Sequence, residues 1–167
     1  MSGNIRPTCM FLWQTMIHKW YVLRAGMRTG APLWRLVIHD WTKFMPSEAP
    51  HYGRRQYGAA DDNLGFAQAW NHHHKRHKHH WEWWIPVTSH RLSPVKAGEP
   101  LPMPEWAVRE MVADWLGASK AYHGFFPETL QEWDWYHREK SSLRLHEETA
   151  RLLEKVLDDY FRRPLPR

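Results

Sequence analysis

The sequence predicts an all-α fold, a single-domain bundle of about six helices. Apolar residues recur at intervals of three and four along most of the 167-residue chain, which is the spacing of one helix face. Strand signals are nearly absent, because no Asn-Gly or Asp-Gly turn joins alternating apolar runs. A hydrophobic content of 43% and a charged content of 25% are typical of globular domains. We expect residues 1–161 to form one helical domain and 162–167 to form a frayed basic tail.

The first expected helix covers 9–27 and is apolar on most of its faces, which predicts that it is buried. The glycine-containing stretch 26–30 ends it, and Pro32 stands where a first-turn proline belongs. The second helix is expected over 33–44. Its broad apolar face consists of Leu33, Trp34, Val37, Ile38, Trp41 and Phe44.

A third helix is expected to start at Asp61 or Asp62, either of which can cap it, and to run through Trp70 into a group of histidines. The preceding stretch 52–60 is basic and contains glycine, so it predicts a loop or a short helix. A Pro- and Gly-rich loop at about 85–103 follows the histidines.

Three further helices are expected in the second half of the chain. The fourth opens at Pro104-Glu105, the fifth covers 127–139 and the sixth covers 146–161. The fourth has a regular apolar stripe at helical spacing, formed by Ala107, Val108, Met111, Val112, Trp115 and Leu116.

Composition limits the classes of function. No apolar run approaches the ~18 residues of a membrane span, and the first seven residues lack the order of a signal peptide. Cys9 is the only cysteine, so neither an internal disulfide nor a Cys-based zinc site is expected. We therefore expect a cytoplasmic protein without a membrane partner. The net charge of +5 favours anionic partners and keeps nucleic acid among them.

The chain has 12 tryptophans and 13 histidines, and both numbers are unusual for this length. Three of the tryptophans, at 81, 83 and 84, are too dense for routine packing, and Trp81 in particular is expected to bind substrate by stacking on a flat group. Five others fit apolar stripes and are expected in the core: Trp13, Trp20, Trp34, Trp41 and Trp115.

Two acidic residues fall on apolar helix faces. Asp40, next to His39, lies inside the stripe of its predicted helix, and a buried carboxylate needs a basic side chain or a metal ion beside it. Asp114 lies at the edge of the fourth helix's stripe, with Glu110 one turn earlier. His18 lies within the apolar first helix. Each also has an ordinary interpretation, as a capped or salt-bridged pair, a boundary residue or a hydrogen-bonded core histidine.

Six histidines lie within 72–80, interleaved with Lys75, Arg76 and Lys78. Such a tract can grip phosphate or nucleic acid from the surface. The flanking tryptophans favour a different arrangement, in which part of the tract faces the interior. No phosphate-binding loop, dinucleotide fingerprint, Gly-x-Ser-x-Gly or His-Glu-x-x-His motif offers competing chemistry.

The order of His18, His39-Asp40, the histidines and Asp114 on successive helices resembles the HD-domain superfamily of metal-dependent phosphohydrolases. The chain is also similar to a small family often carried by bacteriophages, which would place it in the host cytoplasm. The matching segments span most of 15–120 and are His18-Lys19, Pro32-Leu33-Trp34-Arg35, His39-Asp40-Trp41-Thr42-Lys43-Phe44, Ala69-Trp70, His73, His79-His80-Trp81-Glu82, Pro102-Met103-Pro104-Glu105 and Glu110-Met111-Val112-Ala113-Asp114-Trp115.

The resemblance implies one or two divalent transition metals, namely Fe, Mn, Zn, Ni or Co. It implies that the first ion is held by His18, His39, Asp40 and Asp114. A second ion, bridged by Asp40, would add His73 with His79 or His80. The sequence leaves open which of these two histidines ligates, and whether His72, His74 or His77 does.

The implied reaction is cleavage of an anionic small molecule, a nucleotide or other phosphoester, by a metal-activated hydroxide. Lys43, one turn beyond the His39-Asp40 doublet, would bind phosphate and stabilise transition-state charge. Arg35, one turn before it, would also bind substrate, and Glu110 would shuttle protons or support the ligands. An HD-fold di-iron oxygenase and a nucleic-acid-binding module that uses the His/Lys/Arg tract stay open as alternatives.

Overall fold

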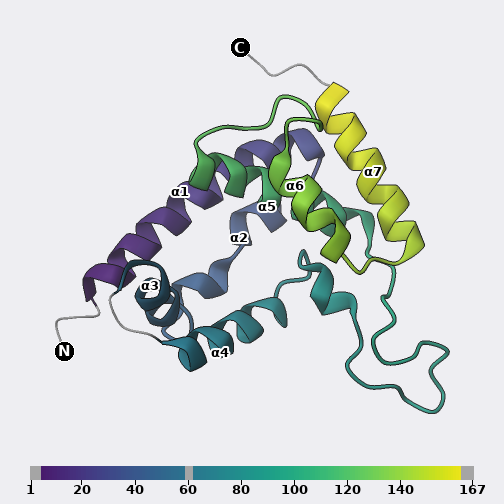
Figure 1. Cartoon of the computed structure of the whole chain (residues 1–167), viewed down its shortest axis with the longest axis horizontal. Helices are drawn as coiled ribbons and strands as arrows, with labels where there is room; N and C mark the ends of the chain where they lie inside the picture. Colours follow the sequence, from purple (N-terminus) through teal and green to yellow (C-terminus); the bar gives the residue numbers. More distant parts are fainter. Residues whose placement is uncertain (1–4, 59–61, 163–167) are drawn as a thin grey trace.

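Helices form all the regular secondary structure in residues 5–58 and 62–162, the parts of the chain that the computed structural model describes (Figure 1). The predicted all-α class is therefore confirmed. The elements in chain order are α1 (Ile5–Thr29), α2 (Leu33–Ile38), the 3-10 turn η2 (Trp41–Phe44), α3 (Ala49–Tyr57), α4 (Asn63–His74), η3 (Trp81–Trp84), α5 (Glu105–His123), α6 (Asp134–Glu139), η4 (Lys140–Ser142) and α7 (Glu147–Arg162).

The two longest helices, α1 and α5, pack against each other and form the centre of the bundle. Helix α7 lies against α5, whereas α3 lies against the other end of α1 and is followed by α4. The loop that connects η3 to α5 carries no helix and projects from the bundle in Figure 1, as the sequence predicts for 85–103.

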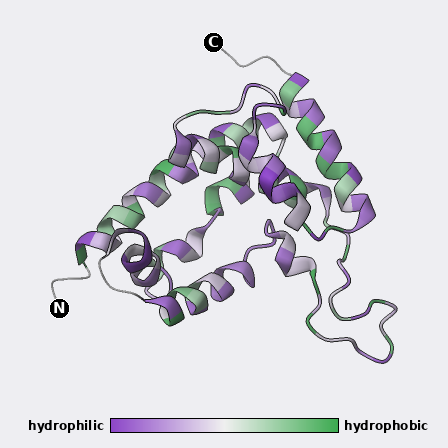
Figure 2. Ribbon diagram, in the orientation of Figure 1, coloured by the Kyte–Doolittle hydropathy of each residue, from purple (hydrophilic) through white to green (hydrophobic). Residues whose placement is uncertain are grey.

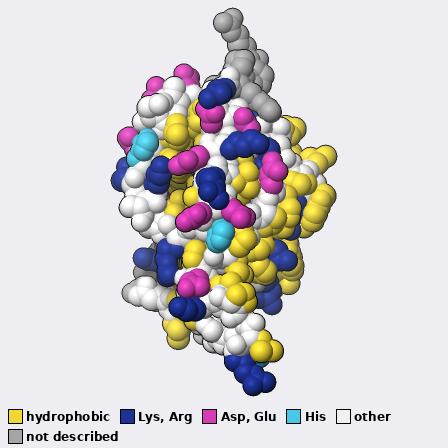
Figure 3. All heavy atoms as spheres, turned by 90° about the vertical axis from the view of Figure 1, so that its right-hand side faces the viewer, with side chains coloured by type: hydrophobic (Ala, Val, Ile, Leu, Met, Phe, Trp, Pro, Cys, Tyr) yellow, Lys and Arg dark blue, Asp and Glu magenta, His cyan; other side chains and the backbone are white. Residues whose placement is uncertain are grey.

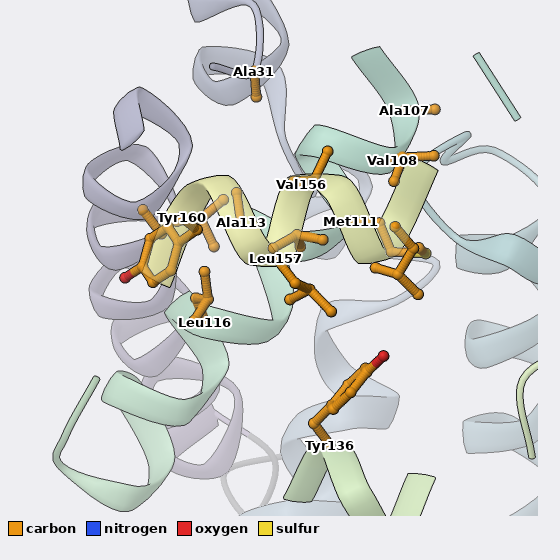
Figure 4. Packing of buried hydrophobic residues seen from close by; sticks show 14 of the residues in the cluster. Ala31, Ala107, Val108, Met111, Ala113, Leu116, Tyr136, Val156, Leu157 and Tyr160 are labelled. Atoms are coloured by element: carbon orange, nitrogen blue, oxygen red, sulfur yellow. The ribbon is translucent and has the colours of Figure 1, made fainter. Parts of the chain in front are cut away.

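The main core lies where α1, α5 and α7 meet, and Figure 4 shows Val156, Leu157 and Tyr160 of α7 in one cluster with Met111, Ala113 and Leu116 of α5. The approach of α1 to α5 is closest at Gly117, because a Cβ atom there would lie 2.6 Å from Cγ2 and 2.7 Å from the backbone nitrogen of Val22. A smaller cluster around Phe11 and Tyr52 joins α1 to α3.

Two of the predicted helices are wrong in extent. The helix expected over 33–44 is divided into α2 and η2, because Asp40 adopts a left-handed conformation with φ of 55°. A left-handed residue cannot continue a right-handed helix. The helix expected over 127–139 is reduced to α6, which starts at Asp134.

The prediction that five tryptophans belong to the core is wrong for four of them. The side chains of Trp13, Trp20, Trp34 and Trp41 are between 50% and 69% exposed. Helix α1 has apolar residues on most of its faces, but it buries only one face against other helices. The apolar side chains on its other faces are therefore exposed, and Figure 2 shows hydrophobic and hydrophilic residues alternating along the helix. The core contains Trp133 instead, whose Nε1 donates a hydrogen bond to Ser119 Oγ over 2.8 Å.

The face that carries α7 has charges of both signs, with hydrophobic side chains along one edge (Figure 3). No helix within residues 5–58 and 62–162 has both the length and the apolar character that a membrane span requires. The first residue of the predicted basic tail, Arg162, is the last residue of α7, and 163–167 lie outside the described residues. Asp61, one of the two predicted helix caps, also lies outside the described residues.

Gly117→Ala tests the contact between α1 and α5. The added methyl would overlap Val22, including its backbone, so we expect the free energy of unfolding to fall by about 1–3 kcal/mol. In an open helical position the same change stabilises by about 0.5–1 kcal/mol. Urea denaturation followed by far-UV circular dichroism gives the sign, and a stabilised variant would contradict the close approach.

Candidate metal centre

The break after α2 positions the His39-Asp40 doublet. Lys19 on α1 donates from Nζ to the carbonyl oxygens of Val37, at 3.1 Å, and of His39. The left-handed Asp40 then turns the chain into η2. As a result, both doublet side chains point into the bundle, where His39 is 0% and Asp40 is 1% exposed.

The first ligand set joins α1, the doublet and α5. His18 Nε2 lies 3.0 Å from Asp114 Oδ1 and 3.7 Å from Asp40 Oδ2. His39 Nε2 lies 3.5 Å from Asp40 Oδ2 and 3.4 Å from Asp114 Oδ1. The structure therefore brings together all four residues that the resemblance implies for one ion.

The second ligand set uses the other oxygen of the same carboxylate. Asp40 Oδ1 lies 3.2 Å from His73 Nε2, at the end of α4, and 3.4 Å from His79 Nε2, in the following turn. His80 also lies within reach of this set. Asp40 thus faces one set with each oxygen, which is the arrangement of a bridging carboxylate.

Buried nitrogen atoms without partners converge in both sets. The ring nitrogen Nε2 is buried and makes no hydrogen bond with any described residue in four histidines, His18, His39, His73 and His79. Asp40 Oδ1 is likewise buried without a hydrogen-bond partner among the described residues. An unsatisfied buried polar atom costs about 1–3 kcal/mol. Because imidazole and carboxylate are ligands of divalent transition metals, this convergence fits such ions. These clusters could hold one or two of them; which of the candidate metals they would hold stays a prediction.

Glu110 on α5 supports a histidine from each set. Its Oε1 lies 3.1 Å from His39 Nδ1 and 3.2 Å from His79 Nδ1, so that each ring can direct its Nε2 at Asp40 or Asp114. Arg35 holds the other oxygen, Oε2, over 2.8 Å. Carboxylates in this position fix the tautomer and orientation of metal-binding histidines.

These contacts bear on two predicted roles. Glu110 is 1% exposed, and it contacts ring nitrogens of His39 and His79, the supporting position that the sequence analysis gave as one of its two roles. The Arg35 guanidinium binds Glu110 and lies over the ring of Trp106, and it is not among the residues that line the cavity described below. This geometry therefore does not provide the substrate contact predicted for Arg35.

Two buried residues that were not predicted from the sequence support the second set. Glu48, just before α3, lies 3.2 Å from His73 Nδ1 through Oε2 and 2.5 Å from His72 Nδ1 through Oε1. Thr42 Oγ1 lies 2.7 Å from His77 Nε2 and 3.1 Å from His73 Nδ1. No local pattern marks Glu48, because it lies between two prolines in a stretch that predicts only a helix break.

Charge compensation sets the protonation of the first set. Burial alone lowers the pKa of a histidine, but Asp40, Asp114 and Glu110 outweigh it and raise the pKa of His39 to about 10. Burial prevails at His18, whose pKa is lowered although the carboxylates of Asp114 and Asp40 lie close to it. Facing histidines and Lys43 hold the pKa of Asp40 well below its usual value in spite of burial.

A cavity of about 430 Å³ opens onto both ligand sets, and its lining includes His18, His73, His79 and Asp114. Lys43 also lines it, with Nζ 2.6 Å from Asp40 Oδ2. The lining further includes Gln56, Trp70, Trp81, Trp115, Trp135 and Tyr122.

Of the three dense tryptophans, Trp81 is the one on the cavity wall. Trp84 is not among the lining residues, and it donates from Nε1 to the Lys78 carbonyl over 2.9 Å. Trp83 carries the Lys78 ammonium 4.8 Å above its ring and likewise lies off the wall.

The histidine tract does not form one continuous helix, since α4 ends at His74. His73, His74, His77 and His79 are buried, which confirms that part of the tract faces the interior. The charged residues between them, Lys75, Arg76 and Lys78, are exposed.

Residues 10–159 match the model of a family described as a family of unknown function, DUF5662. The chain belongs to this family. No curated protein and no solved structure matches it. The DUF5662 match contains both ligand sets, Glu110 and the cavity-lining Lys43, so the site lies within the part of the chain that defines the family.

Glu110→Gln should weaken metal binding without unfolding the chain. Glutamine has nearly the same shape as glutamate, but it lacks the negative charge that faces the imidazoles of His39 and His79. Its amide group would also face either Arg35 or the two rings. We expect the affinity for Zn²⁺ to fall about 10–100-fold, measured by chelator competition. Glu105→Gln, on the same helix but 55% exposed and paired with Arg109, should leave affinity unchanged. Equal affinities in both variants would contradict the supporting role of Glu110.

Loading the site should release protons. With a pKa of about 10, His39 is protonated at neutral pH, whereas a metal ligand must be neutral. Binding therefore displaces a proton, and affinity should fall as the pH falls. Calorimetric titration of Zn²⁺ in neutral buffers of different ionisation enthalpy should give about one proton released per chain; an uptake or no exchange of protons would rule out His39 as a ligand.

Proposed function

We propose that this DUF5662 chain is a metal-dependent phosphohydrolase of the HD-domain type, acting on a nucleotide or other phosphoester. The bridging position of Asp40 carries the proposal, since its two oxygens face two separate sets of ligand atoms. Two divalent ions about 3.5–4 Å apart can clamp the attacking and leaving oxygens of a phosphate ester and activate water at neutral pH.

The chain's own residues would bind and orient the anionic substrate. Lys43 is a cation on the cavity wall, beside the carboxylate shared by both sets, so its ammonium can contact phosphate oxygens. Asp114, a carboxylate on the same wall, belongs to the first ligand set and would contact an anionic substrate only through a bound ion. Trp81 supplies an aromatic wall on which a base can stack.

The two alternative functions are separated by different observations. The nucleic-acid-binding alternative uses the His/Lys/Arg tract, in which Lys75, Arg76 and Lys78 are exposed but four of the six histidines are buried. Binding that survives the loss of Asp40 and Asp114 and weakens steeply with salt would identify it. A di-iron oxygenase would use the same ligand sets. The Lys43 ammonium on the cavity wall favours a negatively charged phosphate ester over an uncharged substrate. Oxygen consumption by the iron-loaded protein would identify the oxygenase.

Lys43→Ala tests the substrate contact. The full chain, purified without a tag and loaded with Mn²⁺ or Zn²⁺, is screened with phosphomonoesters, phosphodiesters and nucleotides for release of phosphate or the leaving group. We expect the variant to lose about 10²–10³-fold in kcat/KM while elemental analysis shows wild-type metal content.

The matched control is Lys75→Ala, which removes an exposed lysine from the histidine tract and should keep full activity. If the loaded wild type hydrolyses none of the ester classes, the proposed function is wrong. Loss of metal from Lys43→Ala would show that the lysine supports the site and does not contact substrate.

A further inference from the structure

A third group of ligand-type side chains lies beside the two sets. It consists of His74 at the end of α4, and of His80 and Glu82 at the start of η3. The tight turn between α4 and η3 brings them together, so that their nearest ligand atoms all lie within 4.8 Å of one another. His74 Nδ1 lies 3.4 Å from Glu82 Oε1.

Two atoms of this group are buried without a hydrogen-bond partner among the described residues, His80 Nε2 and Glu82 Oε2. The rings of His74 and His80 are stacked, with centroids 4.2 Å apart and planes 10° apart. One ligand atom from each of the three residues therefore lies close to the other two, and two atoms of the group are buried without a partner. A bound cation would give such buried atoms the partner that they lack.

The second set does not require His80. His73 and His79 each direct Nε2 at Asp40 Oδ1, and each is supported through Nδ1, by Glu48 and Glu110 respectively. No carboxylate supports His80 in this way within the described residues. His80 is therefore available to the third group.

We propose that His74, His80 and Glu82 form a third divalent-cation site, separate from the pair at Asp40. Two imidazoles and one carboxylate suit Zn²⁺, Fe²⁺, Co²⁺ or Ni²⁺, and three protein ligands leave a coordination position open. One of the stacked rings must tilt for both lone pairs to meet the ion.

All three residues line the cavity next to Trp70 and Trp81. The open position of the third ion would therefore face the same cavity that Lys43 lines. A cation there would bind a second anionic group of the substrate, which gives the cavity two separate anion contacts.

Zinc stoichiometry tests the site. The untagged full chain is dialysed to equilibrium against Zn²⁺, and bound zinc is measured by elemental analysis. We expect His74→Gln and Glu82→Gln each to bind one ion fewer than wild type. His90→Gln, in the exposed loop, should bind as many ions as wild type. Circular dichroism confirms that each variant is folded.

Asp40→Asn separates this proposal from the proposed function. This variant should lose the ions bound at Asp40 and keep one ion. Adding His74→Gln to it should then remove the remaining ion. Unchanged zinc content in both His74→Gln and Glu82→Gln would overturn the third site. Loss of all zinc from Asp40→Asn would also overturn it, because His80 would then belong to the second set.

Discussion

The burial of one carboxylate, that of Asp40, is the constraint on which the rest of the site depends. A charge removed from water costs several kcal/mol unless ions or donors compensate it. Four imidazoles from three parts of the chain and the Lys43 ammonium surround this group. The fold must therefore bring α1, the segment 39–43, the end of α4 and the turn after α4 to one point.

Two further buried carboxylates connect the site to the scaffold. Glu110 lies on α5 but contacts His39 and His79 of other elements, and Glu48 links the segment before α3 to the end of α4. These contacts hold ligand rings in place beside the apolar cluster of Phe11, Ala49, Tyr52 and Ala69. The polar interactions that organise the ligand sets therefore add to the apolar packing in this half of the fold.

Periodicity sufficed for those helices whose apolar stripe meets the core: α5 begins, and α7 begins and ends, close to where the pattern predicts. It failed at Asp40, because the left-handed residue is held by contacts from α1 that no local pattern contains. It also failed for Trp13 and Trp20, since a helix that is apolar all round does not reveal which face has a neighbour. The order of His18, His39-Asp40 and Asp114 pointed to a ligand set that the fold does bring together, whereas Glu48 depends wholly on tertiary structure.

The left-handed backbone at Asp40 also restricts how the sequence can change over evolutionary time. Asparagine tolerates this conformation but removes the negative charge, and glycine relaxes the backbone but removes the ligand. Glutamate would keep the charge, but it tolerates the left-handed backbone less well than aspartate, and its extra methylene would move the carboxylate oxygens away from their present positions. None of these three single substitutions therefore preserves both the left-handed conformation and the position of the carboxylate. Over evolutionary time, loss of the whole centre is easier to reach from this position than a remodelled centre.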